Sequence, residues 1–186
     1  MIQPYTPDVS LAGKLRRRFA RLTHRRPARL NLARPTVSFT FDDIPASAAH
    51  AGAAMLEKHD ARGTFYVCAG LFGREGHMGR FADADEISTL IRRGHEVASH
   101  TLDHVDCHRA SHGDLSADLD ANDAALLALG AAPLHFAYPY GEVSPRAKKQ
   151  LGARYDSLRG VHKALVHDGG DRNQLPSVGI EGADGE

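Results

Sequence analysis

Hydrophobic and polar side chains alternate over residues 37–43 (VSFTFDD), where Val37, Phe39 and Phe41 share one face. A period of two is typical of a strand with one buried face. The run ends in two adjacent carboxylates, Asp42 and Asp43, which repel one another and both need partners. The pattern predicts a buried strand that carries chemistry at its end.

Similar patterns predict further strands and helices along the rest of the chain. The further strands are expected at residues 63–70, 95–100, 134–141, 154–160 and 174–180. The helical segments between them are expected at residues 45–59, 83–94, 111–130 and 145–151. Asp83 with Glu86 forms an N-terminal capping pair for a helix that ends at Gly94, and Ser111 opens a helix that ends at Gly130.

Strict alternation of strands and helices predicts an α/β fold with a parallel sheet and helices outside it. Such a sheet is either open and doubly wound or closed into a barrel. In both cases the reactive groups gather at the carboxyl ends of the strands. We therefore expect the residues at the strand ends to converge: Asp42, Asp43, Ala69, Gly70, His100, Tyr138, Pro139 and Tyr140.

A basic leader over residues 1–36 is expected to precede the main domain, residues 37–186. Four large hydrophobic side chains recur in the leader at helical spacing: Leu11, Leu15, Phe19 and Leu22. Two interpretations of this amphipathic helix stay open. Its hydrophobic face packs on the domain, or the helix contacts an anionic lipid surface or polymer.

Composition fits one globular domain, with 186 residues of which 42% are hydrophobic. Residues 1–41 hold nine basic residues and one acidic residue, which leaves 14 basic and 22 acidic residues in the remainder. Cys68 and Cys107 have neither a metal-pair spacing nor a disulfide framework, so we interpret them as free thiols. No hydrophobic run suits a membrane span or a secretory signal, which favours a cytoplasmic location, with contact at the inner membrane face left open.

Four histidines follow the strand expected at 95–100 at intervals of four residues: His100, His104, His108 and His112. The chain contains 12 histidines, so this spacing alone is a weak signal. His100 and His104 lie closest to the strand end, where Asp42 and Asp43 are also expected. The two later histidines are expected on the surface.

Two imidazoles and one carboxylate are a common ligand set for catalytic zinc, which keeps a coordination position open for water or substrate. A second carboxylate beside the metal can act as general base. In this interpretation one Asp binds the metal and the other takes a proton. The alternative is that the Asp pair caps the helix that begins near Pro45.

Three motifs in this order resemble the polysaccharide deacetylases (carbohydrate esterase family four, including the nodulation-type chitooligosaccharide deacetylases). TFDD at residues 40–43 is similar to the first motif of that family. HTLDH at residues 100–104 is similar to the second, and YPYG at residues 138–141 to part of the third. The resemblance covers residues 37–180.

The resemblance implies a deformed parallel (β/α) barrel that hydrolyses N-acetyl groups, and occasionally O-acetyl groups, on a sugar chain. A divalent metal, zinc by default with cobalt or nickel also suitable, would be bound by three side chains: Asp43, His100 and His104. Metal-bound water would attack the amide carbonyl while Asp42 acts as general base. The metal and the backbone N–H of Tyr140, next to Pro139, would stabilise the oxyanion.

Two features depart from the family pattern. The third motif usually begins with an arginine that holds the catalytic Asp, whereas this chain has Ala137 there. We expect Arg159, at the end of the next strand, to reach Asp42 instead. A late family motif supplies a general-acid histidine, and only His167 resembles it, although it follows the third motif too closely. The fold is therefore expected to be truncated at its C-terminal end.

Three classes of function remain. The leading hypothesis is a metal-dependent deacetylase acting on an acetylated glycan, and the second is a non-catalytic descendant that binds glycan with the same cleft. The third is a binder of nucleic acid or an anionic surface through residues 14–29. Nucleic acid is disfavoured as a partner because Phe19 is the only aromatic residue in that basic stretch.

Overall fold

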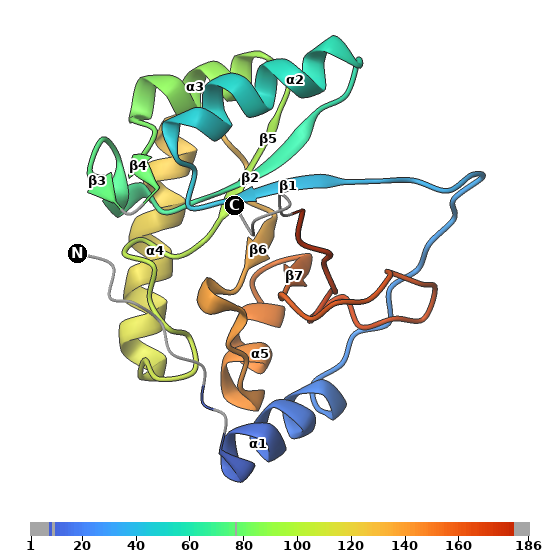
Figure 1. The fold of residues 1–186 in the computed structure, drawn as a ribbon. Coiled ribbons are helices and arrows are strands. Elements are labelled where there is room, and N and C mark those ends of the chain that lie inside the picture. Colours follow the sequence, from blue (N-terminus) through green and yellow to red (C-terminus); the bar gives the residue numbers. More distant parts are fainter. Residues whose placement is uncertain (1–7, 9, 77, 181–186) are drawn as a thin grey trace.

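The computed structural model describes residue 8 and residues 10–76 and 78–180. Its main sheet contains five parallel strands, adjacent in chain order: β1 (Phe39–Asp42), β2 (Gly63–Val67), β5 (Glu96–Ser99), β6 (His135–Ala137) and β7 (Ser157–Arg159). The sheet curls into a half-barrel and does not close (Figure 1). The expected parallel α/β fold, truncated as a barrel, is therefore confirmed.

Helices connect the strands and pack against them. They are α2 (Ala53–Lys58), which follows a π-helical turn at Ala48–Gly52, α3 (Ala84–Arg92), α4 (His112–Ala128) and α5 (Pro145–Gly152). Figure 1 shows α2 and α3 together at one end of the molecule, with α4 along its side. At the opposite end, α5 packs against the N-terminal helix α1 (Leu11–Leu22).

Local capping signals determine where the helices begin. Asp83 accepts a hydrogen bond from the backbone N–H of Glu86 (2.9 Å), and the Glu86 carboxylate accepts one from the backbone N–H of Asp83 (2.8 Å). Ser111 caps α4 by accepting from the N–H of Asp114. Both caps were expected from the sequence, because they need only residues three positions apart.

The core has two main parts on the helix-covered side of the sheet. Beneath α2 and α3 it contains Ala53, Phe65, Ile87, Leu90 and Val97. Beneath α4 and α5 it contains Leu115, Leu119, Phe136, Leu151 and Leu158. Burial of these side chains stabilises the sheet and so fixes the positions of the strand ends.

The first strand is less buried than its pattern predicts. It begins at Phe39, and Val37 is 75% exposed, so the prediction that Val37 lies on a buried face is wrong. The physical reason is that β1 is an edge strand, paired only with β2. Phe41 does reach the core, where its ring stacks on that of Phe65 at 4.8 Å.

Two further differences between the predicted and the observed fold concern short strand pairings. The strand predicted at 174–180 is reduced to one parallel bridge between Arg159 and Leu175, so that prediction is wrong. Leu175 donates its N–H to the carbonyl of Leu158 (2.8 Å), which covers part of the edge of β7. A two-stranded antiparallel hairpin, β3 (Glu75–Gly76) and β4 (Gly79–Arg80), was not expected.

The hydrophobic face of α1 points away from the domain. Leu11, Leu15, Phe19 and Leu22 are 81%, 72%, 59% and 69% exposed, whereas Gly13 and Ala20 are buried. The prediction that the hydrophobic face packs on the domain is therefore wrong. No helix among the described residues is long and apolar enough to span a membrane.

The segment that follows α1 pairs with a segment near the other end of the chain. Pro27 and Asp171 form an antiparallel bridge. Ala28 donates its N–H to the carbonyl of Gly170 (2.6 Å), and Arg172 donates its N–H to that of Arg26 (2.8 Å). Residues 26–28 and 170–172 thus form one short ladder.

Candidate active site and metal centre

The carboxyl ends of the strands bring together most of the residues singled out from the sequence. Asp42 is the last residue of β1, and Asp43 follows it. His100 comes directly after β5, and Arg159 is the last residue of β7. Tyr140 lies in the 3₁₀ turn Pro139–Gly141 that follows β6. Because the strands are parallel, their carboxyl ends and these groups lie on the same side of the molecule.

Asp43 is the centre of the group. Its Oδ1 atom lies 3.2 Å from Nε2 of His104 and 3.6 Å from Nε2 of His100. The rings of the two histidines meet edge to face with their centroids 5.0 Å apart, and both residues are buried. One carboxylate and two imidazoles thus converge, which is a donor set that suits a first-row divalent cation such as zinc.

A hydrogen bond fixes the orientation of His100. Its Nδ1 atom lies 2.8 Å from the carbonyl oxygen of Ala137, which can only accept, so Nδ1 carries the proton. Burial lowers the pKa of His100, which keeps the ring neutral at pH 7. The lone pair of Nε2 therefore points toward Asp43. Metal-binding histidines are typically oriented in this way, by a carbonyl or carboxylate on the second ring nitrogen.

Arg159 lies against Asp42. One terminal nitrogen of the guanidinium contacts both carboxylate oxygens of Asp42, and the group lies over the ring of Tyr66 with its carbon 5.0 Å from the ring centroid. Ala137, where the family pattern has an arginine, is the residue paired with Arg159 on the neighbouring strand. The structure thus places an arginine beside Asp42 from one strand further along.

Cys68 was interpreted from the sequence as a free thiol, and it is free and buried. Its sulfur donates to the carbonyl of His100 (3.0 Å), and burial raises its pKa well above the usual range. Cys68, Asp43 and His100 also offer ligand atoms that lie within 4.8 Å of one another. The strand predicted at residues 63–70 contains Cys68, whereas β2 ends at Val67, so sequence reasoning did not place this thiol at a strand end.

Two polar residues of α4 support the site, and sequence reasoning missed both. Asp118 accepts hydrogen bonds from the N–H groups of Leu102 (2.7 Å) and Asp103 (3.3 Å), in the loop that carries His104. Asn122 is fully buried and joins α4 to the ends of β2 and β5: it accepts from Ala69 N and donates to Val67 O and Ser99 Oγ. The available signal was that Asn122 continues the stripe of Leu115, Leu119 and Leu126.

Left-handed backbone conformations gather around the same group. Residues other than glycine with positive φ include Asp43 (57°), Ile44 (55°), Thr101 (67°), His104 (55°) and Tyr140 (59°). Such conformations cost free energy and persist where the surrounding structure enforces them, which is common at functional sites. Here they turn the chain sharply after β1, β5 and β6, so that the side chains face one another.

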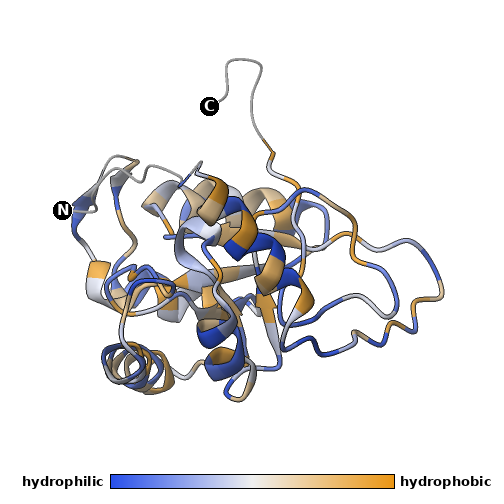
Figure 2. Ribbon diagram, turned by 90° about the horizontal axis from the view of Figure 1, so that it is seen from below, coloured by the Kyte–Doolittle hydropathy of each residue, from blue (hydrophilic) through white to orange (hydrophobic). Residues whose placement is uncertain are grey.

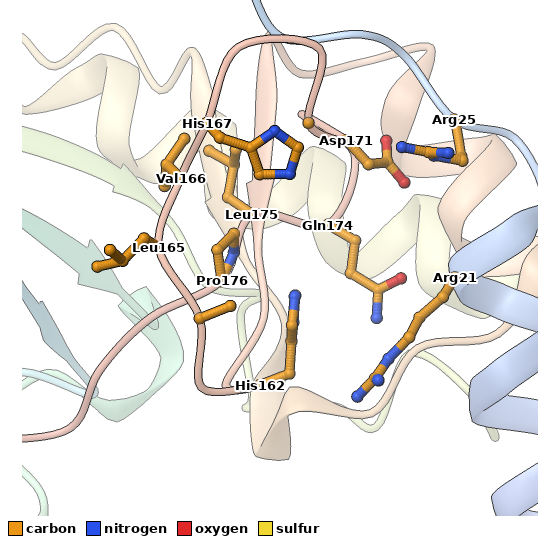
Figure 3. Close-up of a pocket in the computed structure, with 12 residues that line it drawn as sticks. Arg21, Arg25, His162, Leu165, Val166, His167, Asp171, Gln174, Leu175 and Pro176 are labelled. Carbon is orange, nitrogen blue, oxygen red and sulfur yellow. The ribbon is translucent and has the colours of Figure 1, made fainter.

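His167 lies away from the group around Asp43. It is exposed, and it lines a separate pocket of about 200 Å³ together with Arg21, Arg25 and His162 (Figure 3). Among the described residues that line this pocket, none belongs to the group around Asp43. The structure therefore does not bring His167 to the expected catalytic residues.

Comparison with known proteins bears on the family and the fold. Curated relatives include a chitin deacetylase of Arthroderma benhamiae, 28% identical over 118 residues, which are 62% of this chain and 30% of the relative. A probable peptidoglycan-N-acetylglucosamine deacetylase of the same organism is 29% identical over 115 residues, which are 59% of this chain and 24% of the relative. The matched segment thus spans less than a third of these relatives.

A solved structure, that of IcaB from Ammonifex degensii, has a TM-score of 0.71 and 21% identity, and the match covers 91% of this chain and 83% of that chain. This likeness confirms the fold. The family model described as polysaccharide deacetylase matches residues 29–155, more than half of the chain, and so confirms the resemblance of the three motifs. The chain belongs to the polysaccharide deacetylase family.

Proposed function

We propose that this protein is a metal-dependent hydrolase that removes acetyl groups from an N-acetylated glycan. The observation that carries the proposal is the convergence on Asp43 Oδ1 of His104 Nε2 at 3.2 Å and His100 Nε2 at 3.6 Å. The neighbouring carboxylate, Asp42, is held by Arg159. Membership of the polysaccharide deacetylase family supports the reaction class.

The proposed substrate class is a polymer or oligomer of N-acetylated sugar. One curated relative is named for chitin and the other for peptidoglycan N-acetylglucosamine. Both are polymers that contain N-acetylglucosamine, so an acetamido group on a glucosamine unit is the shared chemistry. Hydrolysis of its amide bond yields acetate and a free amine on the sugar.

Asp43, His100 and His104 would hold the metal, with zinc as the first choice. When bound, the cation supplies Lewis acidity that activates water and polarises the acetyl carbonyl. Asp42 takes the proton of the attacking water, and that proton is then available to the amine nitrogen when the C–N bond breaks. The backbone N–H of Tyr140, next to Pro139, is the proposed donor to the carbonyl oxygen as its negative charge develops.

Arg159 is a positioning residue in this proposal. Its guanidinium touches both oxygens of Asp42, so it limits rotation of that carboxylate. His167 is left out of the mechanism because it lies in a different pocket.

Calorimetric titration of zinc into the metal-stripped protein tests the metal site without depending on turnover. We expect one tight site in the parent chain and none in the double variant Asp43→Ala, His104→Ala. A matched control is the double variant Asp85→Ala, His59→Ala, since both residues are exposed and lie outside the site. Equal zinc affinity in all three proteins would contradict the proposed ligand set.

Acetate release then tests the reaction. The zinc-loaded parent is expected to release acetate from N-acetylglucosamine oligomers or from peptidoglycan fragments, while Asp42→Asn binds zinc but loses turnover. Zinc binding without acetate release from either substrate would contradict the catalytic proposal and favour the glycan-binding alternative.

A further inference from the structure

The most unusual surface of the molecule is the outer face of α1. Surface helices of globular proteins normally turn their hydrophobic stripe toward the core. In α1 the stripe of Leu11, Leu15, Phe19 and Leu22 is turned outward, and each of these side chains is more than half exposed. Leaving four large hydrophobic side chains in water forgoes the stabilisation that their burial would give.

The orientation of α1 is enforced by the residues on its other face. Arg16 lies 2.9 Å from the carboxylate of Glu142, and Lys148 donates to the carbonyl of Ala20 at 2.7 Å. Glu142 and Lys148 are both buried, so they depend on polar partners. Rotating α1 to bury its leucines would remove these contacts from two buried charges. The hydrophobic stripe therefore stays outside while the domain is folded.

Basic side chains border the stripe. Lys14 and Arg18 each follow a stripe leucine by three residues, which makes them neighbours on the helix surface, and Arg21 follows one turn later. All three are exposed, and α1 contains no acidic residue. Figure 2 looks at the molecule from the end where α1 lies, and hydrophobic positions there are interspersed with strongly hydrophilic ones.

The cationic surface continues into the pocket next to α1. Arg21 and Arg25 line the pocket of about 200 Å³ together with His162 and Gln174 (Figure 3). The only carboxylate among its described lining residues is Asp171, which lies 2.5 Å from the ammonium of Lys148 and is therefore neutralised. The pocket thus offers two guanidinium groups to an anion.

We propose that the outer face of α1 docks on an anionic lipid bilayer, with its hydrophobic stripe at the acyl boundary and Lys14, Arg18, Arg21 and Arg25 at the headgroup phosphates. An amphipathic helix with a hydrophobic stripe edged by basic residues fits such a surface. Each basic residue near an anionic membrane strengthens binding by electrostatic attraction. The proposal does not rest on the deacetylase reaction.

A second copy of the chain fits this face less well. If two α1 helices paired symmetrically, each would face its own copy, and the rows containing Lys14 and Arg18 would be brought together. Like charges in such a contact oppose association. Charge complementarity therefore favours an anionic partner, and four hydrophobic side chains in one stripe favour a bilayer over a soluble polyanion.

Flotation of the full chain with lipid vesicles tests the proposal. Vesicles of pure phosphatidylcholine are compared with vesicles in which about a third of the lipid is phosphatidylglycerol. We expect at least tenfold stronger binding to the anionic vesicles, weakened by raising sodium chloride from about 0.1 to 0.5 M. Added inorganic phosphate at matched ionic strength should not compete strongly, since it cannot use the hydrophobic stripe.

Matched variants distinguish the contribution of the hydrophobic stripe of α1 from that of exposed hydrophobic residues elsewhere on the surface. Leu15→Ser with Phe19→Ser should reduce vesicle binding at least tenfold, whereas Leu127→Ser with Leu134→Ser, exposed hydrophobic residues elsewhere, should not. All four side chains are exposed, so thermal melting should be similar in both variants.

Three outcomes would overturn the proposal. One is an absence of parent binding to anionic vesicles, and another is equal binding by the stripe variant. The third is a concentration-dependent dimer that the stripe variant abolishes, which would assign the face to a second copy of this chain.

Discussion

The guanidinium of Arg159, on the last strand of the sheet, contacts both carboxylate oxygens of Asp42, on the first strand. These strands form opposite edges of the sheet, so the contact crosses the mouth of the half-barrel and does not follow the ladder. Arg159 is buried and lies over Tyr66, which fixes its direction. The curl of the sheet therefore determines the position of Asp42, the proposed general base.

Replacing Arg159 tests its role as a positioning residue. In Arg159→Ala we expect kcat for acetate release to fall about 100-fold with little change in KM, because Asp42 loses its fixed orientation. Arg159→Lys should retain part of the activity, since an ammonium supplies charge without a planar guanidinium. Arg92→Ala, on the exposed surface of α3, is the control. Unchanged turnover in Arg159→Ala would remove Arg159 from the mechanism.

The arginine can also be relocated. Ala137 and Arg159 are paired in the ladder, and paired residues point to the same face of a sheet. Adding Ala137→Arg to Arg159→Ala should therefore raise kcat about tenfold above that of the single variant. Ala137→Arg alone should lower the melting temperature, because the site is fully buried and already filled. A double variant no better than Arg159→Ala would contradict the proposed equivalence of the two positions.

Cys68 distinguishes two possible ligand sets. If Asp43, His100 and His104 hold the metal, Cys68→Ser should change the zinc dissociation constant by less than about threefold, and the cobalt-loaded parent should show no thiolate-to-metal absorption band. Loss of at least about tenfold in zinc affinity, together with such a band in the parent, would assign the site to Asp43, Cys68 and His100 instead.

Replacing Asn122 should lower the stability of the fold because its hydrogen bonds are lost, even when the side-chain volume is kept similar. In Asn122→Leu the groups that its amide joins, Ala69 N, Val67 O and Ser99 Oγ, would lose a partner in the core. We expect a loss of about 2–4 kcal/mol in the free energy of unfolding, measured by urea denaturation. Asn31→Leu, at an exposed position, is the control and should change stability by less than about 0.5 kcal/mol.

Glu86 links stability to pH. Hydrogen bonds from Arg80 are the main cause that lowers the pKa of Glu86 to about 2 in the folded chain. Because the folded pKa lies below the usual value of 4.5, the ionised carboxylate stabilises the fold above pH 4.5, and this contribution is lost as pH falls toward 2. Glu86→Gln should therefore cost about 1 kcal/mol at pH 7 and much less near pH 2.5. A pH-independent difference would show that the charge is not responsible.

The parts of the fold that depend on near neighbours in the chain could be predicted from the sequence. The caps at Asp83 and Ser111 are examples, since donor and acceptor lie three residues apart. The parallel sheet followed from the alternation of strands and helices. The grouping of Asp43, His100 and His104 followed from the strand ends and from the family motifs, and its role as a metal site stays a prediction.

Features set by tertiary packing could not be predicted in this way. The spacing of Leu11 and Leu15 indicated an amphipathic helix correctly, but its orientation depends on Glu142 and Lys148, which are more than a hundred residues away. Leu175 continues a hydrophobic pattern, yet it makes a single bridge because β7 is only three residues long. The proximity of Cys68 to Asp43 depends on a sharp turn at Asp43.

The short ladder between residues 26–28 and 170–172 has a mechanical consequence. Arg26 pairs with Arg172, and Ala28 pairs with Gly170. The chain therefore enters the ladder at Arg26 and leaves it at Arg172, and these two residues lie at the same end of the ladder. A force that pulls the termini apart would therefore open these hydrogen bonds one after another, as a zipper opens, and would not load them all at once in shear. Under tension, these hydrogen bonds should yield one at a time and therefore at low force.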